Sequence, residues 1–262
     1  MSDQIKIPCM FIRGGTSRGP YFLKKDLPED TSKRDKILLS VMGSPDIRQI
    51  DGLGGAEPVK SKVAIIDKSK EDGIDVDYYF AQVKIDEPIV DTKPSCGNIL
   101  VGVGPYAIEK GLVNAKDGET SVIVRDKNTG MKIEQIVKTP NKIVQYEGDC
   151  FIDGVPTPGS PIKLKFLNII GSQTEKLFPT GNSQDQIDGI NFTLIDCAVP
   201  MVIFKSSELG LKDNETFEKL DSDKNLINKM DSIRIKIAKE VGLGDVVNSV
   251  IPKTAIVNSS KS

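Results

Sequence analysis

One pattern of strand, turn and strand occurs twice in this chain, and it constrains the fold more than any other feature. CMFIRGGTSRGPYFLKKDLP, from Cys9, and NFTLIDCAVPMVIFKSSELG, from Asn191, both contain a lysine followed shortly by an acidic residue and leucine. A helical pattern follows each copy, and then PVKSKVAII in the first and SVIPKTAIV in the second, which aligns Lys62 with Lys253. An internal repeat of this kind predicts two similarly built lobes made by duplication.

The two copies differ in how far they continue. Only the first is followed by VDYYFAQVKI and by TKPSCGN with its apolar helix, so we predict a first lobe over residues 1–182 and an incomplete second lobe over residues 183–262. A lobe without its central helix would expose apolar strands and unpaired strand edges. We therefore expect the complete protein to be longer by about 100 residues, on the usual size of domains. The alternative is a second lobe that is simply smaller.

Short β-rich runs dominate the first half of the chain, with helical patterns between them. The runs are bounded by Gly, Pro, Asn and Asp, and DKNTG between two of them predicts a hairpin turn. Helical periodicity covers residues 31–43, which open with a Thr/Ser cap, residues 97–110 with a kink or break at Pro105, and residues 223–242. Regular βαβ alternation is missing, so the predicted fold class is α+β. The predicted strands are CMFIR, GPYFL, KVAII, VDYYFAQVKI, TSVIVRD, MKIEQIVKT, KIVQY and a last one in SPIKLKFLNII.

Histidine is absent from all 262 residues. This removes His-based zinc sites, Ser-His-Asp and Cys-His nucleophiles, and the usual proton shuttle near neutral pH. Acid–base chemistry must then fall to Cys, Lys, Asp, Glu or Tyr. The four cysteines, Cys9, Cys96, Cys150 and Cys197, are scattered without paired spacing, so we expect no disulfide framework.

Charge and composition argue against two classes of partner, nucleic acids and membranes. The net charge is −2, Trp is absent, and no dense Lys/Arg run appears, so we expect no nucleic-acid partner. The first residues, MSDQIKIPCM, lack the features of a signal peptide, and no apolar run approaches the length of a membrane span. We therefore expect a cytoplasmic protein without a membrane partner. A homo-oligomer is compatible with the sequence, which does not specify one.

Two of four notable stretches lie early in the chain. RGGTSRG, residues 13–19, lies between two predicted strands and offers N–H groups, hydroxyls and arginines to a carboxylate or phosphate. It lacks the spacing of a nucleotide P-loop, and an ordinary glycine-rich hairpin loop explains it as well. IDGLGGAEPVKSKVAII places Lys62 at the start of an apolar strand, either as a candidate base or as an ordinary solvated lysine.

The other two stretches are SCGN and LFPTGN. Cys96 precedes a predicted helix, whose unpaired N–H groups stabilise a thiolate or a bound carboxylate, and Asn98 caps the helix or contacts a ligand. A buried structural cysteine is the alternative. LFPTGN, residues 177–182, has the composition of a turn and lies at the proposed lobe junction, where ligand clefts usually occur. Together, a thiol, an amine and an anion cradle predict removal of a proton beside a carboxylate and its return elsewhere.

In the same order along the chain, these motifs resemble those of PrpF-type isomerases. RGGTSRG, the IDGLGG and SKVAII block, CGN with GVGPYAI, and LFPTGN carry the resemblance, which runs from about Ile7 to the end. The family includes 2-methylaconitate cis-trans isomerase, methylitaconate delta-isomerase and 4-oxalomesaconate tautomerase. The resemblance implies a diaminopimelate-epimerase-like fold of two pseudo-symmetric lobes, each a β-barrel-like sheet around a central helix, with substrate between them. It also implies that no metal or organic cofactor is needed.

The resemblance also implies roles for individual residues. Cys96 and Lys62 match the pair that handles the proton, and the substrates are unsaturated di- or tricarboxylic acids. This chain departs from the family at Ser95, where Asn is usual, and at Val199-Pro200, where Asn-Pro is usual. The residues that match carboxylate-binding positions are Thr16, Ser17, Gly97 and Asn98.

Our main hypothesis is a cofactor-independent isomerase that moves a double bond, or inverts cis–trans geometry, in an unsaturated polycarboxylate. One of Lys62 and Cys96 removes the proton, and the other or the same residue returns it. An amino-acid epimerase of the same fold is the first alternative, but it needs a second facing cysteine, and the only cysteine of the second lobe is Cys197. The second alternative is an inactive fragment or a carboxylate-binding protein.

Overall fold

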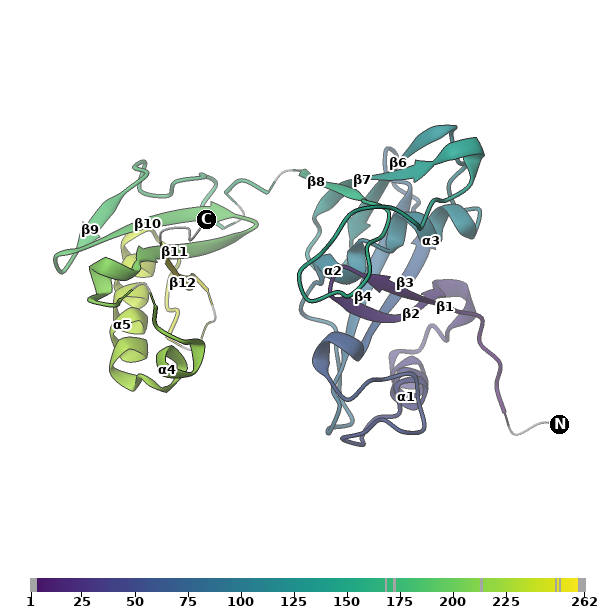
Figure 1. Cartoon of the computed structure of the whole chain (residues 1–262), viewed down its shortest axis with the longest axis horizontal. Helices are drawn as coiled ribbons and strands as arrows, with labels where there is room; N and C mark the ends of the chain where they lie inside the picture. The colour runs from purple at the N-terminus through teal and green to yellow at the C-terminus, as the bar shows by residue number, and fades with distance from the viewer. Residues whose placement is uncertain are drawn as a thin grey trace. The chain divides into compact units, whose positions relative to one another are not determined.

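The computed structural model describes residues 4–167, 169–171, 173–212, 214–247, 249 and 251–258. The chain forms two compact units, Met1–Leu167 and Asn168–Ser262 (Figure 1). The boundary predicted after residue 182 lies inside the second unit, because the segment after Leu167 hydrogen-bonds to the end of a strand there. Gly171 N donates to Asp196 O at 2.8 Å, and Asp196 N donates to Leu177 O at 2.8 Å.

The first unit is built on one eight-stranded mixed sheet, in the order β1-β2-β3-β4-β6-β7-β8, with β5 paired to β4. β1 and β2 form the hairpin around RGGTSRG, β2 pairs with β3 in parallel, and β3 pairs with β4 antiparallel. β6 turns back into β7 through DKNTG, as predicted. The strands are β1 (Met10–Gly14), β2 (Ser17–Leu23), β3 (Lys62–Lys68), β4 (Val76–Val83), β5 (Val90–Asp91), β6 (Gly118–Asp126), β7 (Lys132–Thr139) and β8 (Lys163–Leu167).

The two faces of this sheet carry different helices. One face packs against α2 (Gly97–Leu100) and α3 (Val103–Glu109), and sheet residues such as Tyr78 and Phe80 complete that core. The other face packs against α1 (Thr31–Met42). In Figure 1, α2 and α3 lie among the strands and α1 lies apart from them. Successive side chains of a strand point to opposite faces of the sheet, so alternate residues contact α2 and α3 on one face and α1 on the other.

The predicted helix over residues 97–110 is broken, but at residues 101–102 rather than at Pro105. Pro105 falls in the first turn of α3. Backbone N–H groups in a first turn have no hydrogen-bond acceptor within the helix, so a proline there removes no helical hydrogen bond. The buried side chain of Gln135 satisfies backbone groups at the break. Gly104 N donates to its Oε1 at 2.6 Å, and its Nε2 donates to Leu100 O at 2.7 Å. A polar side chain in the core therefore holds the two short helices together.

Two local predictions are wrong. The N-cap of α1 is Asp30 rather than Thr or Ser, and its carboxylate accepts the Lys33 N–H at 2.8 Å. KIVQY forms no strand, because it follows a 3-10 turn at Pro140–Lys142 and makes isolated hydrogen bonds instead of a ladder. One of these joins Gln145 N to Lys138 O at 3.0 Å.

The second unit repeats the start of the first, which confirms the internal repeat. β10 (Ile190–Cys197) and β11 (Val199–Lys205) form a hairpin, a 3-10 turn follows, and β12 (Lys253–Val257) pairs with β11 in parallel. The first unit has the same order, in which β3 pairs with β2 in parallel after a 3-10 turn and a helix. Lys253 opens β12 just as Lys62 opens β3.

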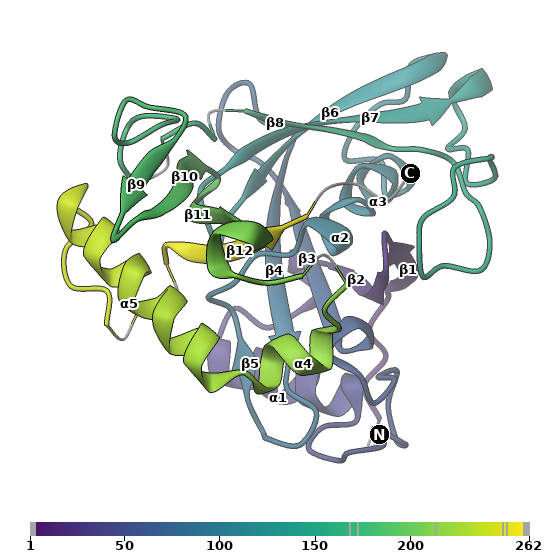
Figure 2. The same ribbon diagram turned by 60° about the vertical axis from the view of Figure 1, so that its left-hand side comes forward.

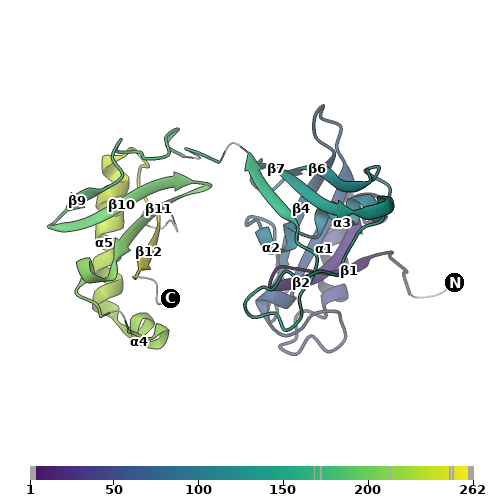
Figure 3. The same ribbon diagram turned by 45° about the horizontal axis from the view of Figure 1, so that its top comes forward.

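One long helix covers the sheet of the second unit. α5 (Lys224–Glu240) lies beside the strands in Figures 2 and 3 and follows the short α4 (Phe217–Ser222). A third strand, β9 (Asp185–Ile187), pairs with β10. The apolar side of α5 packs on Leu194 and neighbouring strand residues. The buried Arg234 guanidinium donates to three backbone carbonyls of the segment before β12, those of Val246, Ser249 and Ile251.

Candidate functional site

The glycine loop and the start of α2 lie against each other, although they are 82 positions apart in the chain. Asn98 Nδ2 donates to Thr16 Oγ1 at 3.0 Å. A Cβ on Gly14 would lie 2.1 Å from Asn98 O, and one on Gly15, at φ +52°, would lie 2.2 Å from Asn98 Oδ1. Only glycine allows so close an approach, so RGGTSRG packs directly on the CGN segment.

Ser17 carries a buried hydroxyl that lacks a partner among the described residues, and Gly97 borders open space. The Ser17 side chain is 2% exposed, and its Oγ has no hydrogen-bond partner within the described residues. A buried hydroxyl without a partner is costly, which suits a group that awaits a ligand. Ser17 alternates with Gly19 and Tyr21 along β2, and Tyr21 packs in the core with α2. A Cβ on Gly97 would meet no atom within 4 Å, so the first turn of α2 is open on that side.

Lys62 is held above β4 by two neighbours. Its Nζ donates to Gln82 Oε1 at 2.8 Å and lies 5.1 Å from the centre of the Phe80 ring, a favourable position for a cation. Its backbone is fixed by Gly19, where a Cβ would lie 1.8 Å from Lys62 O. Gln82 is the antiparallel partner of Lys62 in the sheet, so strand register alone places the two side chains together.

Cys96 is the N-cap residue of α2 and is half-buried at the edge of the main core. Its backbone is extended, with φ −139° and ψ 104°, and the first turn of α2 has no side-chain cap. The Cys96 carbonyl accepts the Leu100 N–H at 2.9 Å and the Tyr78 hydroxyl at 3.3 Å. The backbone N–H groups of this turn are therefore available to bind a ligand or water.

The structure brings Cys96 and Lys62 over the same face of β4. Tyr78, Phe80 and Gln82 alternate along that strand and so share one face. Tyr78 contacts the Cys96 backbone, Gln82 binds the Lys62 amine, and Phe80 lies between them in the strand. Thr16 is hydrogen-bonded to Asn98, and Gly97 and Asn98 open α2 directly after Cys96.

Two buried tyrosines fix the first turn of α2. The Tyr21 hydroxyl donates to Ile99 O at 2.5 Å, and the Tyr78 hydroxyl donates to Cys96 O. Burial, and secondarily the electrostatic effect of Cys96, raises the pKa of Tyr21 and of Tyr78 well above the usual value. Both hydroxyls therefore stay protonated as hydrogen-bond donors at neutral pH.

We expect these tyrosines to make the first unit sensitive to alkaline pH. Below about pH 10 a tyrosine is protonated whether the chain is folded or unfolded, so its contribution to stability is constant. Above that value only the unfolded chain releases the proton, and the free energy of unfolding falls by about 1.4 kcal/mol per pH unit for each tyrosine. Urea unfolding between about pH 10 and 11 should show a shallower fall for Tyr78→Phe than for the unchanged protein. Equal slopes would contradict this expectation.

Sequence reasoning missed the residues that support the site. Gln82, Phe80 and Tyr78 all lie in VDYYFAQVKI, for which the sequence pattern predicts a strand and no functional role. Their spacing of two residues was the available signal, since it places them on one face of the strand. Pairing that strand with KVAII would have placed Gln82 opposite Lys62.

The remaining motif and the remaining candidate cysteine lie in the second unit. LFPTGN forms a turn closed on Asp185, whose carboxylate accepts the Thr180 hydroxyl at 2.6 Å and Asn182 Nδ2 at 2.9 Å. Cys197 is exposed at the end of β10 and does not precede a helix. An alternating pair of thiols, as an epimerase needs, gains no support from this position.

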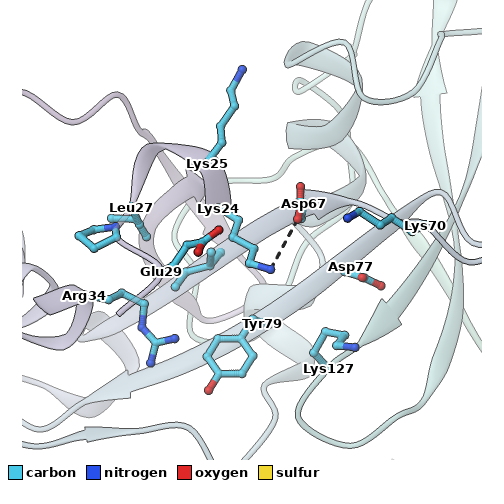
Figure 4. A pocket seen from close by; sticks show the side chains of 12 residues that line it. Lys24, Lys25, Leu27, Glu29, Arg34, Asp67, Lys70, Asp77, Tyr79 and Lys127 are labelled. Atoms are coloured by element: carbon cyan, nitrogen blue, oxygen red, sulfur yellow. Dashed lines mark ion pairs between the residues drawn. The ribbon is translucent and has the colours of Figure 1, made fainter. Parts of the chain in front are cut away.

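A pocket of about 650 Å³ lies on the opposite face of the sheet from Lys62 (Figure 4). Its floor includes Ile65, Asp67, Asp77 and Tyr79, which alternate with the residues that face α2. Both carboxylates of this floor are already paired with cations. Lys24 lies 3.8 Å from Asp67, and Asp77 binds the Arg125 guanidinium through both oxygens. We therefore do not assign the candidate site to this pocket.

The described part of the chain shows no cluster of Cys, Asp or Glu arranged to hold a metal ion. Over the same residues, no helix combines the length and apolar character that crossing a bilayer requires.

Comparison with known proteins defines first the class of fold and then the family. A crystal structure of methylitaconate-delta-isomerase matches with a TM-score of 0.85 and 38% identity, over 96% of this chain and 66% of that one. This match confirms the predicted α+β fold. The family model described as PrpF protein matches residues 4–262. The chain belongs to the PrpF family.

Individual relatives are similar over nearly the whole chain. YbhH of Escherichia coli (strain K12) is 50% identical over 256 residues, which are 98% of this chain and 73% of YbhH. The (4E)-oxalomesaconate Delta-isomerase of Novosphingobium sp. (strain KA1) is 48% identical over 250 residues, which are 95% of this chain and 70% of that protein.

Proposed function

We propose that this protein is a cofactor-independent isomerase that moves a double bond, or inverts cis–trans geometry, in an unsaturated di- or tricarboxylic acid. Named relatives are isomerases of oxalomesaconate, 3-methylitaconate and 2-methyl-aconitate, at 48%, 39% and 36% identity. The observation that carries the proposal is that Cys96 and Lys62 lie over one face of β4, beside the open first turn of α2.

The substrate carboxylates bind the glycine loop and the start of α2. Thr16 Oγ1 accepts from Asn98, which leaves its own O–H to donate to a carboxylate, and the unpartnered Ser17 hydroxyl supplies a second donor. The backbone N–H groups of the first turn around Gly97 supply further donors. α2 is only one turn long, so these local N–H groups contribute more than a helix dipole.

Proton transfer needs one acid and one base. One of Cys96 and Lys62 takes a proton from the carbon next to the double bond, and the electron pair of that C–H bond delocalises over the allyl-carboxylate system. The negative charge is stabilised by the same hydroxyl and N–H donors. The other residue, or the same one, returns a proton at a different carbon, and the double bond shifts. Atoms and electrons balance without an oxidant or a co-reactant.

The test is to incubate the protein in D₂O with methylitaconate, methylaconitate and oxalomesaconate and to follow both solvent exchange and double-bond position by NMR. Deuterium at an allylic carbon together with double-bond migration in one of them is expected. Binding of these acids without exchange would overturn the proposal in favour of a carboxylate-binding protein. Exchange confined to the α-carbon of an added amino acid would overturn it in favour of an epimerase.

A further inference from the structure

The turn between β6 and β7 reaches across to β4 through one amide side chain. β6 pairs with β4 only as far as Tyr78 and Asp126, and beyond that point Phe80 has no neighbouring strand on that side. Asn128 takes the place of a strand there. Phe80 N donates to Asn128 Oδ1 at 2.8 Å, and Asn128 Nδ2 donates to Phe80 O at 2.9 Å. The side-chain amide thus repeats the hydrogen bonding of a peptide group.

The same amide holds the segment that leads to Cys96. Asn128 Nδ2 also donates to Thr92 O at 2.7 Å and to Pro94 O at 3.0 Å. These two carbonyls belong to a segment outside regular structure, which has no ladder of its own to fix it. One side chain therefore joins β4 beneath Lys62 to the approach to Cys96.

Asp126 makes a second link, to the residue directly before Cys96. Its side chain is fully buried, its Oδ1 accepts the Asn128 N–H at 2.8 Å, and its Oδ2 accepts a short hydrogen bond from the Ser95 hydroxyl. A buried carboxylate is retained only where donors satisfy it. The residue directly before Cys96 is thus bonded to a buried carboxylate of the turn.

We propose that Asp126 and Asn128 are positioning residues, which set the place of Cys96 relative to Lys62. The proposal rests on the proposed function in so far as Cys96 transfers a proton. Asn128 binds both backbone groups of Phe80, the residue under the Lys62 amine, and two carbonyls of the segment before Cys96. Asp126 and Ser95 fix the last residue of that segment. In this proposal the turn between β6 and β7, and not side-chain packing alone, sets the distance between the Cys96 thiol and the Lys62 amine.

The discriminating variant is Asn128→Asp. The carboxylate still accepts the Phe80 N–H, but the two N–H donors of Nδ2, which serve the carbonyls of Phe80, Thr92 and Pro94, are lost. Thr129→Ala is the matched control in the same turn, since Thr129 Oγ1 only accepts the Met131 N–H at 3.4 Å. Two measurements report position. One is the rate of Cys96 alkylation by iodoacetamide, mapped by mass spectrometry against the exposed Cys9 and Cys150. The other is the separation of kcat from KM.

For Asn128→Asp we expect kcat to fall by about 10²-fold, the effect of misplacing a reacting group by about 1 Å, while KM changes far less. Cys96 alkylation should become faster than in the unchanged protein, because the half-buried thiol is released, and the rates at Cys9 and Cys150 should stay the same. Behaviour identical to Thr129→Ala in both measurements overturns the proposal.

Ser95→Ala is the second variant, to be used if Asn128→Asp fails to fold. It removes only the link to Asp126, and unchanged kcat and unchanged Cys96 alkylation in that variant also overturn the proposal. Alkylation does not depend on isomerase activity. If Cys96→Ala and Lys62→Ala both retain full activity the proposed function fails, whereas the alkylation rates still show whether the turn positions the thiol.

Discussion

Replacing Cys96 by alanine is expected to lower kcat by about 10²–10⁴-fold, and replacing Lys62 by alanine is expected to do the same, because each removes a positioned acid or base. Neither change should unfold the protein. The Cys96 side chain is only half-buried. Among the described residues the Lys62 amine donates to Gln82 alone, and Gln82 keeps its own bonds to Pro58 O and Ser61 O. Steady-state kinetics with the substrate found active in D₂O measures both effects.

Matched controls exist for both replacements. Lys68→Ala removes an exposed lysine from the other end of the same strand, where it donates to Leu112 O, and Cys150→Ala removes an exposed cysteine. Both controls should retain normal kcat. Near-normal turnover by both Cys96→Ala and Lys62→Ala would rule out the proposed proton transfer. A loss confined to one of them would indicate that a single residue both removes and returns the proton.

Replacing Gly14 by alanine is expected to lower the free energy of unfolding, whereas replacing Gly97 by alanine is expected to leave it nearly unchanged. At Gly14 the new Cβ would lie 2.1 Å from Asn98 O, so the loop or α2 must shift, at a cost of about 1–3 kcal/mol in the free energy of unfolding. At Gly97 the new Cβ meets no atom within 4 Å, and stability should change by no more than about 0.5 kcal/mol.

The same methyl group at Gly97 enters the space proposed for a substrate carboxylate. Loss of one charge-assisted hydrogen bond, about 1.5–3 kcal/mol, corresponds to a rise in KM of about tenfold or more. Urea unfolding and KM, measured together on both variants, separate the two causes. A Gly97→Ala variant with unchanged KM would show that the carboxylate does not bind over the first turn of α2.

Local signals in the sequence were reliable where local physics decides the structure. The turn DKNTG, the ends of α1 and α5 and most strands follow from turn residues, caps and periodicity within a few positions. Two predictions failed where another residue supplied the hydrogen bonds at a helix end or a helix break. Asp30 caps α1 in place of a neighbouring hydroxyl residue, and Gln135, distant in sequence, supports a break in the helix before Pro105.

The sequence by itself determined the duplicated lobe, the family and the set of residues able to carry chemistry, since a chain without histidine leaves few acids and bases and the motifs occur in a fixed order. Only the tertiary structure decided how those residues meet. Strand register puts Gln82 beside Lys62, and a turn closed more than thirty residues after Ser95 holds the approach to Cys96 through Asp126. Such contacts depend on pairing between distant segments, and no local propensity encodes that pairing.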